Sequence, residues 1–213
     1  MTTLCGIKGK DFIVLGSDSQ VTAGNLRIPF PYKKIEEVGS NLIASTGSVG
    51  YSQRLLSYAL RNLKVQKALN DSQKEIFVDE LIRELSELNF NLPLEHKHFN
   101  SFNFIVGGLS GIEPKLFSIG SDGSVLEIPT YYADGSGSEF AYSIIAEGFY
   151  NEMSPNDAVQ LCDKALKQSS THDIYTNRDP QIFLLQWKEK KNSYEITKYN
   201  LVTKEPKVEA SKQ

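Results

Sequence analysis

The start of the chain constrains the fold more than any other stretch. Two short apolar runs, residues 4–7 and 12–15, are separated by Lys8-Gly9-Lys10-Asp11, which has the glycine and aspartate typical of a hairpin turn. Because strand-forming residues begin at once, we expect this end to be tied into a sheet. Removal of Met1 would give Thr2 a free α-amine beside its hydroxyl, and such a threonine can be a nucleophile with its own amine as base. Thr2 also fits an ordinary β-branched strand residue.

The composition describes an ordinary globular protein. Of 213 residues, 40% are apolar and 23% charged, and the net charge of -3 is too small to indicate binding to nucleic acid or an anionic membrane. No apolar run reaches the roughly 18 residues needed to span a bilayer, and the start lacks a secretory signal pattern. Cys5 and Cys162 lie in apolar patterns, which favours buried thiols over a disulfide or metal framework. We therefore expect a cytosolic compartment.

Four segments have the pattern of amphipathic helices. Apolar residues recur at helical spacing within 49–69 and again within 73–90. A third helix is expected to open at the loop 134–138. The fourth has a strong start signal at Ser154, a capping serine followed by a proline in the first position and an aspartate three residues after the cap. Each helix is expected to lay one apolar face on a sheet. The stripe of the fourth helix consists of Ala158, Cys162, Ala165 and Leu166.

Strand patterns alternate with these helix pairs. Besides the first hairpin, the runs that favour strands are 41–46, 102–108, 115–119, 125–128, 182–187 and 194–197. The order of strands, two helices, strands, two helices, strands indicates a layered α+β fold, with two antiparallel sheets packed together and helices outside. Since no linker or repeat is visible, we expect one domain over 1–203. The charged stretch 204–213 is expected to be a disordered tail.

The motifs occur in an order that resembles a known family. They are Thr2-Thr3, Gly6, Ser17-Asp18, Val21-Thr22-Ala23-Gly24, Lys33-Lys34, Thr46-Gly47, Gly135-Ser136-Gly137-Ser138 and Asp173. Together they resemble a β-type subunit of the 20S proteasome over nearly the whole chain. The HslV peptidase is a more distant resemblance, through the threonine pair at the start and the segment 173–177. The resemblance implies the four-layer αββα sandwich of the N-terminal nucleophile hydrolases, assembled into heptameric rings.

The resemblance implies that Thr2 is the nucleophile, with Asp18 and Lys34 as its acid and lysine partners and Gly47 as its oxyanion amide. A cationic Lys34 would lower the pKa of the threonine hydroxyl and amine, and Asp18 would hold the lysine oriented and charged. The backbone N–H of Gly47 would stabilise the oxyanion of a tetrahedral intermediate. Taken alone, Asp18 and Lys34 also fit a structural ion pair, and Gly47 fits a glycine that ends a strand.

The remaining implied residues support the nucleophile or line the substrate pocket. Ser136 and Asp173 match supporting residues, and Thr176 replaces the family's second serine there. Taken alone, Ser136 also fits a helix cap, and Asp173 a solvated residue after a helix. Two glycines usually follow this group; Asn177 and Arg178 replace them here, a departure that bears on the local backbone and on subunit packing. The pocket is carried over onto Val21, Tyr32, Ser45 and Val49.

The function that this resemblance implies is a threonine peptidase that cuts unfolded polypeptide inside a closed chamber. The implied partners are other β subunits, rings of α subunits and an ATPase regulator, in the cytoplasm and, in a eukaryote, the nucleus. No cofactor is implied, and His96, His98 and His172 lack metal-ligand spacing and fit surface loops. Two alternatives stay open: an inactive structural β subunit that keeps Met1, and a small-molecule amidase of the same superfamily.

Overall fold

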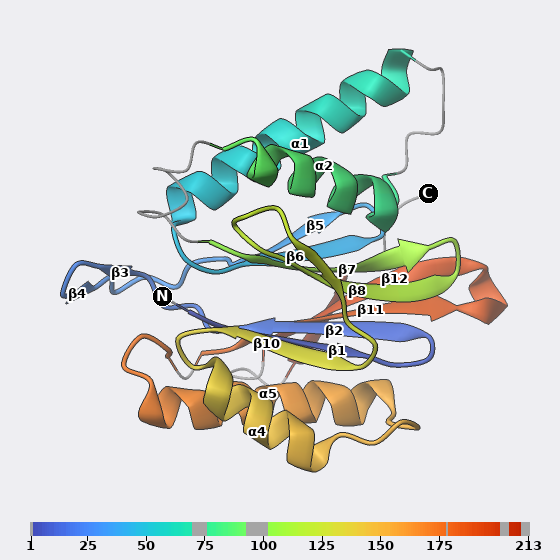
Figure 1. Ribbon diagram of the computed structural model, residues 1–213. Coiled ribbons are helices and arrows are strands. Elements are labelled where there is room, and N and C mark those ends of the chain that lie inside the picture. Colours follow the sequence, from blue (N-terminus) through green and yellow to red (C-terminus); the bar gives the residue numbers. More distant parts are fainter. Residues whose placement is uncertain (1, 70–75, 93–101, 178, 201–204, 210–213) are drawn as a thin grey trace.

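The computed structural model describes residues 2–69, 76–92, 102–177, 179–200 and 205–209. They form four layers, in which one helix pair, two antiparallel β-sheets and a second helix pair are stacked in that order (Figure 1). This arrangement confirms the predicted αββα sandwich. Within the described ranges, no helix is long and apolar enough to cross a membrane.

The first sheet has six strands in the order β10-β1-β2-β11-β12-β13. The predicted first hairpin is confirmed, since the Gly9 N–H donates to the Phe12 carbonyl oxygen at 2.9 Å and Leu4 pairs with Ser17. This register places the start of β1 beside the end of β2. The strand bounds are β1 Thr3–Lys8, β2 Phe12–Ser17, β10 Tyr131–Gly135, β11 Gln181–Lys188, β12 Ser193–Asn200 and β13 Glu205–Glu209.

The second sheet has five strands in the order β5-β6-β7-β8-β9, and a separate two-stranded hairpin joins β3 to β4. The sequence patterns predicted β6 to β9 with slightly different ends. They did not predict β3, β4 or β5, because these strands are short and carry charged or exposed residues rather than an apolar run. The bounds are β3 Thr22–Ala23, β4 Leu26–Arg27, β5 Ile35–Val38, β6 Asn41–Ser45, β7 Phe104–Ser110, β8 Glu113–Ile119 and β9 Val125–Glu127.

The helices lie on the outer faces of the two sheets, with α1 and α2 on one side and α4 and α5 on the other (Figure 1). The predicted helix over 49–69 is confirmed as α1, and the capping signal before α5 is confirmed because Ser154 Oγ accepts a hydrogen bond from the Asp157 N–H at 3.1 Å. The bounds are α1 Val49–Leu69, α2 Val78–Phe90, α4 Ser138–Gly148 and α5 Pro155–His172.

The prediction for the second helix, 73–90, was wrong at its start. Residues 73–75 lie outside the described ranges, and Ile76 and Phe77 are not helical. Two hydrogen bonds account for this. Asn41 Nδ2 donates to the Ile76 carbonyl oxygen at 2.6 Å, and Glu80 Oε2 accepts from the Phe77 N–H at 3.0 Å. The Glu80 side chain thus caps the helix, which begins at Val78.

Residues 205–209 form a strand, where a disordered tail over 204–213 was predicted; the other residues of that stretch lie outside the described ranges. Within it, β13 pairs antiparallel with β12, for example Thr197 with Val208 and Lys198 with Lys207. Without β13, the outer edge of β12 would leave its backbone N–H and C=O groups unpaired. A short, charged edge strand such as β13 is a common way to protect a sheet from pairing with other chains.

Apolar side chains fill all three spaces between the four layers. Because both faces of the first sheet are covered, successive residues of β2 alternate between two cores: Phe12 and Val14 pack with α4 and α5, whereas Ile13 packs against the second sheet. Cys5 and Cys162 are buried free thiols, as predicted, and their sulfurs lie 2.7 Å apart where β1 meets α5.

Candidate active site

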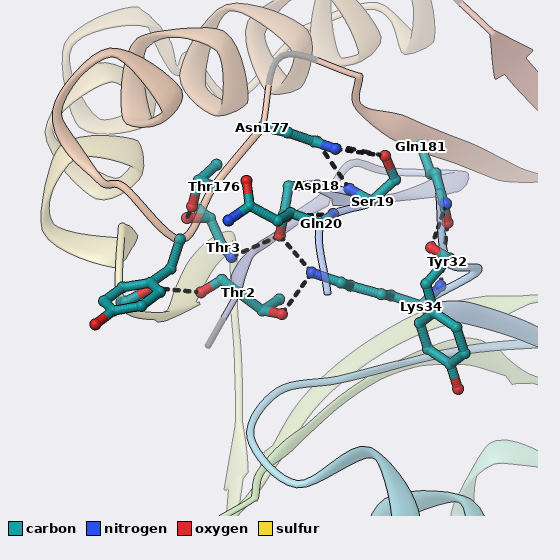
Figure 2. A network of polar contacts seen from close by, with 12 residues as sticks. Thr2, Thr3, Asp18, Ser19, Gln20, Tyr32, Lys34, Thr176, Asn177 and Gln181 are labelled. Carbon is teal, nitrogen blue, oxygen red and sulfur yellow. Dashed lines mark hydrogen bonds and ion pairs between the residues drawn. The ribbon is translucent and has the colours of Figure 1, made fainter. Parts of the chain in front are cut away.

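Three segments that are distant in sequence meet at one end of the sandwich, at the start of β1. Thr2 precedes β1, Asp18 follows β2, and Lys34 precedes β5 of the other sheet. Lys34 Nζ donates to Thr2 Oγ1 at 2.6 Å and lies 2.8 Å from Asp18 Oδ1 (Figure 2). The hairpin register explains the first part of this arrangement, since pairing of Leu4 with Ser17 brings Thr3 opposite Asp18 and leaves Thr2 one position further along the chain.

The carboxylate of Asp18 is fully buried and holds three donors. Its Oδ1 accepts from Lys34 Nζ and from the Thr3 N–H at 3.0 Å, and its Oδ2 accepts from the Gln20 N–H at 2.8 Å. Charge-assisted bonds of this kind satisfy a buried carboxylate and fix its direction. Asp18 therefore holds the ammonium of Lys34 against the hydroxyl of Thr2.

Burial lowers the pKa of Lys34. Its side chain is only 5% exposed, and this desolvation lowers its pKa below the ordinary 10.5, while the negative charges of Asp18 and Asp173 oppose the shift. A lysine with a lowered pKa gives up its proton more readily than a surface lysine. Such groups cluster at functional sites.

A second polar cluster lies on the other side of Thr2. Asp173 ends α5, where its Oδ2 accepts from Ser136 Oγ and from Thr176 Oγ1, both at 2.6 Å. Thr176 Oγ1 also bonds Thr3 Oγ1 at 2.6 Å. The Ser136 N–H donates to the Thr2 carbonyl oxygen at 2.8 Å, and its Oγ approaches the same oxygen at 3.3 Å. The predicted supporting group is thus assembled around the backbone of Thr2 and Thr3.

Two glycines shape the backbone at this point. Gly135 has φ +93, and a β-carbon placed there would lie 1.9 Å from the Thr2 carbonyl oxygen. The same β-carbon would lie 3.4 Å from Thr46 Cγ2, so Gly135 stands between Thr2 and the end of β6. Gly47, which follows Thr46 in the chain, has φ +82. Only glycine adopts such angles without strain, and the turn exposes Gly47 at the site's edge.

The residues predicted to line a substrate pocket are only partly brought together. Tyr32 and Ser45 line one small pocket that also includes Lys34. Val21 and Val49 are half-buried and are not among its lining residues. Gln53 lines it too, and its amide hydrogen-bonds the hydroxyl of Tyr32.

Sequence reasoning missed several residues that hold this site. Gln181 accepts from the Lys34 N–H at 3.1 Å and donates to the Tyr32 carbonyl oxygen at 2.6 Å, so it fixes the chain on both sides of Lys33. Asn177 was noted as a departure from a pattern but was given no role; its amide contacts Ser19. Nothing in the local sequence of Gln181 indicates its function, because the contact spans 147 positions.

Metal ligands do not gather here. In the part of the chain that the structure describes, no group of three or more histidines, cysteines, aspartates and glutamates is placed to hold a metal ion. His172 is exposed at the end of α5, where its ring stacks on Phe140. His96 and His98 lie outside the described residues.

Comparison with known proteins agrees with the geometry. Residues 1–184 match the family described as Proteasome subunit. This chain belongs to the proteasome subunit family, as a β-type subunit. It is 35% identical over 179 residues to "Proteasome subunit beta 2" of Pyrococcus furiosus, a match that covers 82% of each chain.

Other relatives carry similar names. "Proteasome subunit beta" of Methanocella paludicola is 31% identical over 185 residues, covering 86% of this chain and 87% of the relative. "Proteasome subunit beta" of Nanoarchaeum equitans is 28% identical over 187 residues, covering 87% and 93%. Because the matches span nearly the full length of these proteins, the family applies to the whole sandwich rather than to one part of it.

Proposed function

We propose that this chain is an active threonine peptidase, in which Thr2 attacks peptide bonds after Met1 is removed. The observation that carries the proposal is the buried chain of contacts from Asp18 through Lys34 to Thr2 Oγ1, with distances of 2.8 and 2.6 Å. A structural ion pair alone needs no hydroxyl at its end. A nucleophile does need a polarising partner held in place.

In the proposed reaction, Thr2 Oγ1 attacks the carbonyl carbon of the scissile bond while its proton passes to the free α-amine of Thr2. That amine, with a reference pKa of about 7.7–8.0, suits a base near neutral pH. The Lys34 ammonium stabilises the developing negative charge on Oγ1, and the N–H of Gly47 donates a hydrogen bond to the oxyanion of the tetrahedral intermediate. The proton then goes to the leaving amine, and water hydrolyses the ester that remains on Thr2.

The supporting cluster keeps the amine and hydroxyl of Thr2 in register. Ser136 holds the Thr2 carbonyl oxygen through its N–H at 2.8 Å, and Asp173 orients the Ser136 hydroxyl. Thr176 does the work of the family's second serine, since its hydroxyl bonds Asp173 at 2.6 Å. Tyr32 and Ser45 are proposed to line the substrate pocket together with Val21 and Val49.

The proposed setting is the proteasome core. Three relatives bear the name of a β subunit, and on that basis we propose that this chain assembles with other β subunits in a heptameric ring flanked by α-subunit rings. An ATPase regulator would deliver unfolded polypeptide as substrate. The proposed location is the cytoplasm, and the nucleus as well in a eukaryotic cell.

The deciding experiment compares Thr2→Ala with the wild-type chain in the native assembly. We expect peptide hydrolysis to fall by about 10³-fold or more, because the nucleophile is lost. Thr171→Ala, on the exposed face of α5, is the matched control and should keep full activity. Intact mass of the assembled chain shows whether Met1 is removed. A retained Met1, or equal activity of Thr2→Ala and wild type, would favour the inactive structural subunit instead.

A further inference from the structure

The turn that follows β2 is held from outside by one side chain. Asn177 Oδ1 accepts from the Ser19 N–H at 3.1 Å and from Ser19 Oγ at 3.3 Å, while Asn177 Nδ2 lies 2.9 Å from Ser19 Oγ (Figure 2). The same Oδ1 accepts from the Asp179 N–H at 3.3 Å. Ser19 and Asn177 are both buried. A single amide therefore satisfies a buried backbone donor in a segment 158 positions away.

Ser19 lies between Asp18 and Gln20, which are joined by a hydrogen bond. The Gln20 N–H donates to Asp18 Oδ2 at 2.8 Å, which closes a tight turn around Ser19. The Ser19 N–H points away from that turn and needs a separate acceptor, which Asn177 supplies. Without it, a buried N–H would be left unpaired, and the turn would have to shift to reach another partner.

A second contact joins the same two segments. Gln20 Nε2 donates to the Ile174 carbonyl oxygen at 3.0 Å. The segment 173–177 thus grips the turn 18–20 at two points, through Gln20 and through Asn177. The same segment carries Asp173 and Thr176, which hold Ser136 and Thr3. The turn that aims Lys34 and the loop that supports Thr2 are consequently connected through side chains.

We propose that Asn177 is a positioning residue, which sets the direction of the Asp18 carboxylate and, through it, the contact between Lys34 and Thr2. This rests on the proposed peptidase function. It assigns a role to the position at which the chain departs from the glycine of the proteasome pattern, since a glycine has no side chain to reach Ser19. Among the described residues, Asn177 hydrogen-bonds neither Thr2 nor Lys34, and we propose that it acts on the reaction through the turn at Asp18.

The kinetic test uses Asn177→Ala in the full assembly, with Asn156→Ala on the exposed face of α5 as the matched control. We expect kcat to fall about tenfold in Asn177→Ala with KM changed by less than about twofold, because the reacting groups move while the pocket around Tyr32 stays in place. Asn156→Ala should match wild type. A KM effect as large as the kcat effect, or no effect on kcat, would overturn the proposal.

Ser19→Ala provides a graded second variant. It removes the hydroxyl contacts but keeps the N–H bond to Asn177 Oδ1, so we expect a fall in kcat of only about threefold. In the Asn177→Ala background, Ser19→Ala should add almost nothing, since the partner is already gone. Full additivity of the two changes would contradict the proposed connection. If Asn177→Ala does not assemble, Ser19→Ala is tested alone, and an unchanged kcat in that variant would contradict the proposal.

Crystal structures separate this proposal from the proposed function. In Asn177→Ala we expect the Asp18 carboxylate to move by about 1 Å, a displacement that is large for a catalytic group, and the contact between Lys34 Nζ and Thr2 Oγ1 to lengthen. If wild type proves inactive but the carboxylate moves, the peptidase proposal fails and the positioning role stands. If wild type is active and the carboxylate keeps its place, the positioning role fails alone.

Discussion

Two neighbouring lysines form ion pairs of almost equal length in opposite environments. Lys33 Nζ lies 3.0 Å from Glu36 Oε2, and Lys34 Nζ lies 2.8 Å from Asp18 Oδ1. The side chains of the first pair are 51% and 48% exposed, whereas those of the second are 5% and 0% exposed. The N–O distance therefore does not distinguish the two ion pairs, but the solvent exposure of their side chains does.

The difference follows from where the two side chains point as the chain enters β5. Lys33 reaches water, which screens its charge and hydrates it whether or not Glu36 is near. Lys34 points inward, where its ammonium has lost that hydration and depends on Asp18 and Thr2 for partners. The inward lysine, Lys34, has a desolvated amine with a lowered pKa and a fixed contact with the hydroxyl of Thr2.

Replacing each of the two lysines in turn should have its largest effect on catalysis. Replacing Lys34 with alanine should lower kcat for peptide hydrolysis by about 10³-fold, because the hydroxyl of Thr2 loses the group that polarises it. Lys33→Ala removes the same charge one position away and should leave kcat within about twofold of wild type. Peptide hydrolysis by both variants, in assemblies of equal composition, checks this. Similar losses in the two variants would mean that net charge near the site, rather than the buried contact, matters.

The next effect is on stability and on the pKa of Lys34. Asp18→Asn leaves a buried ammonium without its counter-charge, which should lower the free energy of unfolding by about 3–5 kcal/mol at neutral pH. Since Asp18 opposes the burial-driven lowering, its removal should move the pKa of Lys34 further down from 10.5. Between that pKa and 10.5, the unfolded chain binds more protons than the folded chain, so stability rises with pH over this window.

Glu36→Gln is the surface counterpart and should cost no more than about 1 kcal/mol. Urea unfolding at several pH values and carbon-13 NMR of the labelled lysines would measure both quantities. A Lys34 pKa that rises in Asp18→Asn would contradict the assignment of Asp18 as the group that favours its charged form.

A smaller effect is expected in the cluster around Asp173. Thr176→Val keeps the shape of the side chain but removes a buried hydroxyl that bonds both Asp173 and Thr3. We expect a loss of about 1–3 kcal/mol in the free energy of unfolding, the usual consequence of leaving buried polar partners unpaired. Thr171→Val makes the same change on the exposed face of α5 and should have a much smaller effect. Equal effects of the two variants would show that the hydroxyl of Thr176 has no structural importance.

The sequence predicted those parts of the molecule that local patterns control. The spacing of apolar residues located α1, and the cap at Ser154 located α5, because both signals act within a few residues. The start of α2 was misplaced, since it depends on a hydrogen bond from Asn41, which lies in the distant strand β6. The strand β13 was missed because its pairing with β12 leaves little apolar pattern in a charged stretch.

The same distinction applies to the site. Thr2, Asp18 and Lys34 were named through the order of motifs that resemble proteasome subunits, and the structure brings them into contact. Gln181 and Asn177 were not given roles, since their partners lie on other elements and no spacing rule connects them. The substrate pocket carried over onto Val21, Tyr32, Ser45 and Val49 stays a prediction, although Tyr32 and Ser45 line one small pocket.

The smallest effect sharpens the comparison through salt. The surface pair of Lys33 and Glu36 should couple by about 0.2–1 kcal/mol in a double-mutant cycle at low ionic strength. This coupling should vanish between about 0.01 and 1 M salt, as the screening length falls from about 30 to 3 Å. The buried pair of Lys34 and Asp18 excludes mobile ions, so its coupling energy should change little over the same range. A salt-insensitive surface pair, or a salt-sensitive buried pair, would show that burial does not separate the two lysines as the geometry indicates.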